Sequence, residues 1–99
     1  MRSLETKKQL TIITAKQLES MVVETLEGHG CSGHTVVLAH GAGAFGVQSG
    51  MFDADSNILI YAVMSEDRLA SVLQDINAMM DRGHRLKAVV NDVTVLPWD

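Results

Sequence analysis

Two stretches of this chain repeat apolar residues at the spacing of one helix face, and each lies between runs rich in β-branched residues. The first stretch runs from Thr14 to about Glu27, and the second follows Ser65 and ends near Gly83. Positions i, i+3, i+4 and i+7 mark one face of an amphipathic helix. The residues on these two predicted faces are Leu18, Met21, Val22, Thr25 and Leu26, and then Leu69, Val72, Leu73, Ile76 and Met80.

Residues at the ends of both stretches agree with this reading. Thr14 and Gln17 have the spacing of a capping box, which predicts that the first helix begins there. Gly28 stands where a glycine in the left-handed conformation would end it. Ser65 predicts the N-cap of the second helix, and Gly83 its end.

The β-branched runs predict four strands in the order β-α-β-β-α-β. Two similar β-α-β halves of this kind form the ferredoxin-like fold, an α+β fold with both helices on one face of an antiparallel four-stranded sheet. The third run is almost entirely apolar, which favours a central strand. The predicted strands are Lys8–Ile13, Thr35–His40, Ile58–Met64 and Ala88–Leu96.

The bulk composition indicates one soluble domain that forms oligomers. We expect residues 1–99 to make a single domain, with a loose N-terminus at 1–6 and a mobile loop at 41–57. An apolar fraction of 46% with 20% charged residues leaves apolar surface for a subunit contact. The net charge of −4 argues against nucleic acid. The single Cys31 and the lack of a membrane-length apolar run favour a cytoplasmic protein without membrane insertion.

A glycine-rich stretch after the second predicted strand is the main candidate for a site. Gly41 to Gly46 matches G-x-G-x-x-G, which in a dinucleotide-binding turn is followed directly by a helix. Val47 to Asn57 has no helical period, so this type of turn is excluded. A flexible hairpin tip stays open, as does a mobile loop whose backbone amides bind an anion. A connection of about 16 residues in a compact domain is usually functional or disordered.

Other polar residues offer weaker signals. Arg85 and Lys87 stand two residues apart just before the last predicted strand. They could bind a phosphate, or they could be solvated cations that complement the dipole at the end of the preceding helix. His29, Cys31 and His34 are closely spaced and could bind zinc or copper, although the spacing is not that of a structural zinc site. No nucleophile elbow is present, and we expect no catalytic residue and no enzymatic activity. Asp92 on the last strand favours a structural hydrogen bond.

Several short motifs resemble the PII signalling superfamily. They are Gly33-His34-Thr35-Val36 running into Gly41-Ala42-Gly43, the long loop, and Lys87-Ala88-Val89-Val90. The resemblance covers the chain from about Lys8 to Leu96. The ending Asp92-Val93-Thr94-Val95-Leu96 is more similar to PII-like proteins encoded with bicarbonate transporters and carboxysomes.

The resemblance implies a homotrimer that binds adenine nucleotide in clefts between subunits, with no covalent cofactor. It implies that the Thr35 hydroxyl lies near the adenine, that backbone amides at the loop base meet the phosphates, and that Lys87 reaches the phosphates. The nucleotide-binding residues implied are Thr35, Val36, Gly41, Ala42, Gly43, Arg85, Leu86 and Lys87. A bicarbonate-binding part of the loop would comprise Phe45, Gly46 and Gln48.

Departures from the family pattern refine this expectation. Ala44, Phe45 and Gln48 stand where relatives often carry cations, so we favour ADP or AMP over ATP as the ligand. The sole tyrosine, Tyr61, falls in the third predicted strand, so uridylylation of the loop is not expected. His84 and Leu86 replace residues that are often glycine, which leaves the shape of the phosphate pocket open.

The resulting hypothesis is a signalling protein. Adenine nucleotide, with bicarbonate as a co-ligand, would order the loop from Gly41 to Asn57, and the ordered loop would regulate a partner in inorganic-carbon uptake or carboxysome function. A bicarbonate transporter is one such partner. The alternative is a divalent-metal-binding protein of the same fold that uses His29, Cys31 and His34. The sequence leaves open the partner, the preferred nucleotide and the order of the loop without ligand.

Overall fold

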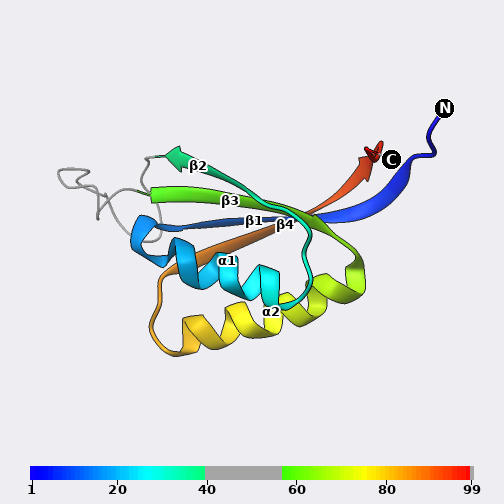
Figure 1. Cartoon of the computed structure of the whole chain (residues 1–99). Coiled ribbons are helices and arrows are strands. Elements are labelled where there is room, and N and C mark those ends of the chain that lie inside the picture. The colour runs from blue at the N-terminus through cyan, green and yellow to red at the C-terminus, as the bar shows by residue number, and fades with distance from the viewer. Residues whose placement is uncertain (40–56, 99) are drawn as a thin grey trace.

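The computed structural model describes residues 1–39 and 57–98, which form a sheet with two helices packed on one face (Figure 1). A short 3₁₀ turn, η1, links the first strand to the first helix. The elements are β1 Glu5–Ala15, η1 Lys16–Leu18, α1 Glu19–Gly28, β2 Thr35–Ala39, β3 Asn57–Met64, α2 Glu66–Asp81 and β4 Leu86–Val95.

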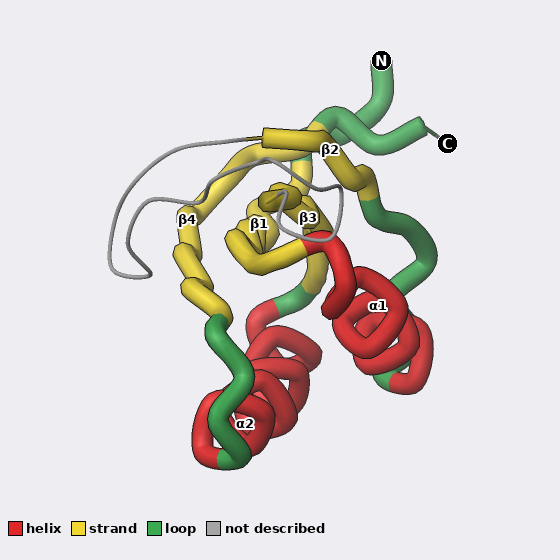
Figure 2. Tube along the Cα trace, turned by 90° about the vertical axis from the view of Figure 1, so that its left-hand side faces the viewer, coloured by secondary structure: helices red, strands yellow, loops and turns green. Residues whose placement is uncertain are grey.

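The sheet confirms the predicted ferredoxin-like fold. Its strand order is β2-β3-β1-β4, and every neighbouring pair is antiparallel. β3 is central, as its apolar sequence predicted, and β2 and β4 are the edges. Figure 2 shows both helices on the same side of the sheet. One face of the sheet is therefore covered by helices, which we call the inner face, and the other, the outer face, is not.

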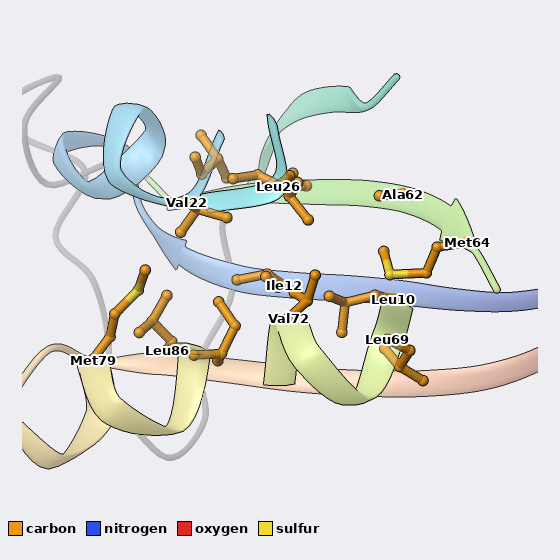
Figure 3. Packing of buried hydrophobic residues seen from close by; sticks show 13 residues of the cluster. Leu10, Ile12, Val22, Leu26, Ala62, Met64, Leu69, Val72, Met79 and Leu86 are labelled. Atoms are coloured by element: carbon orange, nitrogen blue, oxygen red, sulfur yellow. The ribbon is translucent and has the colours of Figure 1, made fainter. Parts of the chain in front are cut away.

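The core lies between the inner face and the helices (Figure 3). Along a strand, side chains point alternately to the two faces. Leu10, Ile12 and Thr14 of β1 point inward and are buried, whereas the residues between them are half-buried on the outer face. The buried apolar side chains are Leu10, Ile12, Val22, Leu26, Ile58, Ile60, Ala62, Met64, Leu69, Val72, Ile76, Met79 and Leu86.

The predicted capping box at Thr14 is wrong. Thr14 belongs to β1, where its Cα lies opposite Leu86 of β4 and Ile58 of β3. The chain then makes the η1 turn, and α1 begins at Glu19 without a side-chain cap. Thr14 is extended because it pairs with strands on both sides, and its hydroxyl donates to the Arg85 carbonyl at 2.8 Å instead of serving a helix terminus.

Two further local predictions at the helices are wrong. Gly28 is the last residue of α1, and Gly30 instead takes the left-handed conformation with φ +78°. On α2, Met79 is buried and Met80 is 36% exposed, so the core stripe ends one residue earlier than predicted.

The remaining helix signals are confirmed. The Arg68 amide donates to Ser65 Oγ at 3.2 Å, which makes Ser65 the N-cap of α2. Gly83 follows α2 with φ +98°, a conformation that glycine adopts at little cost.

The sheet extends beyond the helices at the end that carries the chain termini (Figure 1). β1 already begins at Glu5, within the N-terminal segment that we expected to be loose, and Glu5 lies opposite Val95 of β4. In the part of the chain that the structure describes, no helix is long and apolar enough to cross a membrane.

Candidate functional site

The end of the sheet opposite the termini gathers segments that are far apart in the sequence. β1 and β2 end there, and β3 and β4 begin there (Figure 1). A cavity of about 380 Å³ opens at this end. Its lining residues come from the end of β1, from η1, from the start of β3 and from the loop between α2 and β4: Ala15, Gln17, Leu18, Asn57, Gly83, His84 and Arg85.

The loop between α2 and β4 is held at both ends. At its start, the Gly83 amide donates to the Met80 carbonyl at 2.9 Å, and the His84 amide donates to the Met79 carbonyl at 3.1 Å. At its other end, Thr14 Oγ1 donates to the Arg85 carbonyl at 2.8 Å. The loop that carries Arg85 thus has a defined path along the cavity.

Thr35 and Lys87 both lie on the outer face but at opposite edges of the sheet. The strand register places Thr35 in line with Tyr61 and Thr11, and Lys87 in line with Ile13 and Leu59. Three strand spacings separate β2 from β4, which amounts to about 14 Å. Both side chains are exposed. One chain therefore does not bring these two predicted ligand residues together.

The other predicted nucleotide-binding residues divide into three groups. Arg85 lines the cavity. Leu86 is buried in the core, and Val36 is half-buried and packs against it, so both side chains point away from the outer face. The predicted loop residues lie outside the described residues: Gly41, Ala42, Gly43, Phe45, Gly46 and Gln48.

Two residues of the metal alternative, His29 and Cys31, have other neighbours, and the third, His34, is exposed. His29 Nε2 lies 2.6 Å from Asp75 Oδ2, which links α1 to α2. Cys31 packs against the core, and burial raises the pKa of its thiol, an effect that the nearby Arg68 charge partly opposes. Within residues 1–39 and 57–98, no group of three or more His, Cys, Asp or Glu side chains has an arrangement that could hold a metal ion.

Gln17, Asn57 and His84 line the cavity but were not predicted as site residues. Gln17 was assigned to a helix cap, and Asn57 to the end of the long loop. The available signal was their position, since Asn57 directly precedes one predicted strand, and Gln17 and His84 lie within four residues of the ends of two others. Such ends meet at one edge of the sheet when the strands are antiparallel neighbours.

Comparisons with known proteins identify a family and several similar solved structures. The family model described as nitrogen regulatory protein P-II matches residues 7–96. The chain is also similar to CPII, a nitrogen regulatory PII-like protein from Thiomonas intermedia K12, in a structure bound to ADP, AMP and bicarbonate. The TM-score is 0.86 at 25% sequence identity, over 98% of this chain and 94% of that chain.

Two more solved structures show the same likeness. Another structure of CPII from Thiomonas intermedia K12, with the same three ligands, has a TM-score of 0.79 at 26% identity and covers 94% of this chain and 98% of that chain. A PII-like signalling protein from Thermus thermophilus has a TM-score of 0.81 at 28% identity and covers 95% and 93% of the two chains. No curated protein sequence matches the chain.

Proposed function

The chain belongs to the nitrogen regulatory protein P-II family, and on this premise we propose that it is a PII-like signalling protein that binds adenine nucleotide between the subunits of a homotrimer. The ligand is ADP or AMP in preference to ATP, with bicarbonate as a co-ligand. In the cytoplasm, the liganded protein regulates a partner in inorganic-carbon uptake or carboxysome function, such as a bicarbonate transporter, and it does not act as an enzyme.

The cavity at the end of the sheet opposite the termini is the observation that best supports this proposal. Gly83, His84 and Arg85 line it, and Lys87 follows on the adjoining strand. Cationic side chains and backbone amides are the usual partners of phosphate groups. The related CPII, which shares the fold over nearly its whole length, has been crystallised with ADP, AMP and bicarbonate.

The positions of Thr35 and Lys87 support a site shared between subunits. They lie on opposite edge strands, so β2 of one subunit and β4 of its neighbour would together supply both side chains to one nucleotide. The outer face between these edges carries apolar side chains that no element of the described chain covers, among them Val37, Val63 and Val89 at 43%, 46% and 37% exposure. Contact with further copies would bury this face.

Calorimetry with ADP, AMP, ATP and cyclic AMP, each with and without bicarbonate, tests ligand binding directly. We expect ADP or AMP to bind most tightly and bicarbonate to strengthen the binding. Lys87→Ala should weaken ADP binding by roughly tenfold, since it removes a charge-assisted contact. Lys7→Ala is the matched control, because Lys7 lies on the same face near the other end of the sheet. Absence of binding at millimolar nucleotide would disprove the proposal.

Mixed trimers test whether one site uses two subunits. Thr35→Val and Lys87→Ala subunits are refolded together at equal amounts. If Thr35 and Lys87 of one site come from neighbouring subunits, about a quarter of the sites regain both residues by random assembly. If both come from one chain, no site recovers. Calorimetric counting of high-affinity sites separates these results.

A further inference from the structure

Thr14 differs from the other inward-facing residues of β1. Among the residues that the structure describes, it is the only polar or charged one whose side chain is buried, with 0% exposure. Leu10 and Ile12 precede it on the same inner face and belong to the apolar core. A hydroxyl buried in such surroundings is unfavourable unless it is hydrogen-bonded.

Among the described residues, the Thr14 hydroxyl has one hydrogen-bond partner, and that partner belongs to the cavity wall. Thr14 Oγ1 donates to the Arg85 carbonyl at 2.8 Å. The Cα of Thr14 lies opposite Leu86, the first residue of β4, so this bond reaches one residue beyond the strand into the preceding loop. Ile13, the neighbour of Thr14, lies opposite Lys87.

Packing alone does not require this hydroxyl. Valine has almost the same shape as threonine and would continue the apolar alternation of Leu10 and Ile12, although the two are not equivalent because of the hydroxyl. What threonine adds is a donor aimed at a single carbonyl of the loop. That carbonyl belongs to Arg85, which lines the cavity and stands two residues before Lys87.

We propose that Thr14 is a positioning residue for the nucleotide site, which holds the loop Gly83–Arg85 and the start of β4 in the geometry that phosphate binding needs. Thr14 itself does not touch the ligand, since it is buried behind the cavity wall. This inference rests on the proposed binding of adenine nucleotide at this end of the sheet. A misplacement of about 1 Å in a binding loop is enough to weaken a site substantially.

The test compares Thr14→Val with Thr25→Val. Thr25 Oγ1 donates to the Met21 carbonyl at 2.9 Å within α1, so the control removes a similar threonine-to-carbonyl bond away from the loop. Calorimetry gives the ADP dissociation constant, and thermal unfolding gives the midpoint temperature. We expect Thr14→Val to weaken ADP binding by about tenfold and Thr25→Val to leave it within about twofold. Thr14→Ser, which keeps the donor, should restore most of the affinity.

Adenosine supplies a readout that a purely structural role would not change. Because the proposed effect acts on the loop Gly83–Arg85, which would contact the phosphates, Thr14→Val should lower the affinity for ADP more than the affinity for adenosine. If Thr14→Val does not fold, Thr14→Cys replaces it, since a thiol fills the position with a weaker donor and should give an intermediate loss.

The outcomes separate the two proposals. Wild-type protein that binds no adenine nucleotide disproves the proposed function, and the inference with it. Wild-type protein that binds ADP, together with a Thr14→Val variant of unchanged affinity, disproves the inference alone. Equal losses in Thr14→Val and Thr25→Val would also disprove it, because the effect would then follow stability rather than loop geometry.

Discussion

The two faces of the sheet are built from the same four strands but differ in what covers them. On the inner face, side chains such as Ile12 and Ile60 are at most 1% exposed, because the helices pack over them. On the outer face, their neighbours Ile13 and Tyr61 are only half-buried, and Val63 is 46% exposed. The inner face thus stabilises the fold of the single chain, while the outer face, with Thr35 and Lys87, is available to other molecules.

Removing side-chain volume from the inner face should have the largest effect on stability. Ile12→Ala leaves a cavity in a core position with 0% exposure, so we expect it to lower the free energy of unfolding by about 2–5 kcal/mol. Urea unfolding followed by circular dichroism measures this. Ile13→Ala, one residue along on the outer face, is the matched control and should cost clearly less under conditions that would dissociate the proposed trimer. Equal costs would show that the two faces do not differ in burial.

A charge on the outer face should change assembly rather than folding. Val63→Glu places a carboxylate where the proposed subunit contact would bury it, so we expect the trimer to dissociate into folded monomers. Light scattering gives the mass, and circular dichroism reports the fold. Asn77→Glu adds the same charge on the exposed side of α2 and should leave the trimer intact. A Val63→Glu protein that stays trimeric would place the subunit contact elsewhere.

The fold was largely predictable from the sequence because its signals are periodic and repeated. The alternation in β1 and the stripe on α2 each depend on several residues, so one misplaced residue, such as Met80 for Met79, does not change the prediction. Single-residue signals were less dependable. Ser65 and Gly83 were assigned correctly, but Thr14 was misread as a cap because a local pattern cannot reveal that strands pair on both sides of it.

The candidate site was predictable only in part. Lys87 and Thr35 lie on the exposed outer face, but no sequence pattern reveals that they occupy opposite edges. That separation depends on the strand order β2-β3-β1-β4, which is set by tertiary packing. Leu86 was predicted as a nucleotide-binding residue from the family resemblance, yet alternation along the strand turns its side chain into the core. Any contact from Leu86 to a ligand would therefore involve its backbone.

The reactivity of Cys31 measures how well the periphery of the core on the inner face is shielded from solvent. The thiol packs against the core, and burial raises its pKa, with the Arg68 charge as the smaller, opposing influence. At pH 8 the thiol should therefore stay mostly protonated and react slowly with iodoacetamide, which attacks through the thiolate. We expect the reaction to be about tenfold faster in urea. Equal rates in the folded and unfolded protein would show that this periphery is open to solvent.

The smallest effect is expected where the inner face extends past the helices. There Lys8 takes an inner-face position that apolar residues take further along β1. Its ammonium group donates a hydrogen bond to Asp92 Oδ1 on β4, and Lys8 Nζ lies 3.9 Å from Glu66 Oε1. The hydrogen bond to Asp92 raises the pKa of Lys8; desolvation opposes this, and the charges of Asp92 and Glu66 add to it. A lysine whose pKa is raised in the folded state contributes its full stabilisation below its unfolded pKa of about 10.4. That stabilisation is lost as the pH rises through the pKa of the folded state.

Lys8→Met should therefore lower the urea midpoint slightly at pH 7, and the difference from wild type should shrink above about pH 10.4. The effect should be small because exposed ion pairs are screened by solvent and salt. Lys7→Met, the adjacent lysine on the outer face, controls for the loss of one positive charge. If the difference between Lys8→Met and wild type is the same at pH 7 and pH 11, the pair with Asp92 does not contribute through the charge of Lys8. The inner face would then be stabilised at this end by packing of the lysine stem alone.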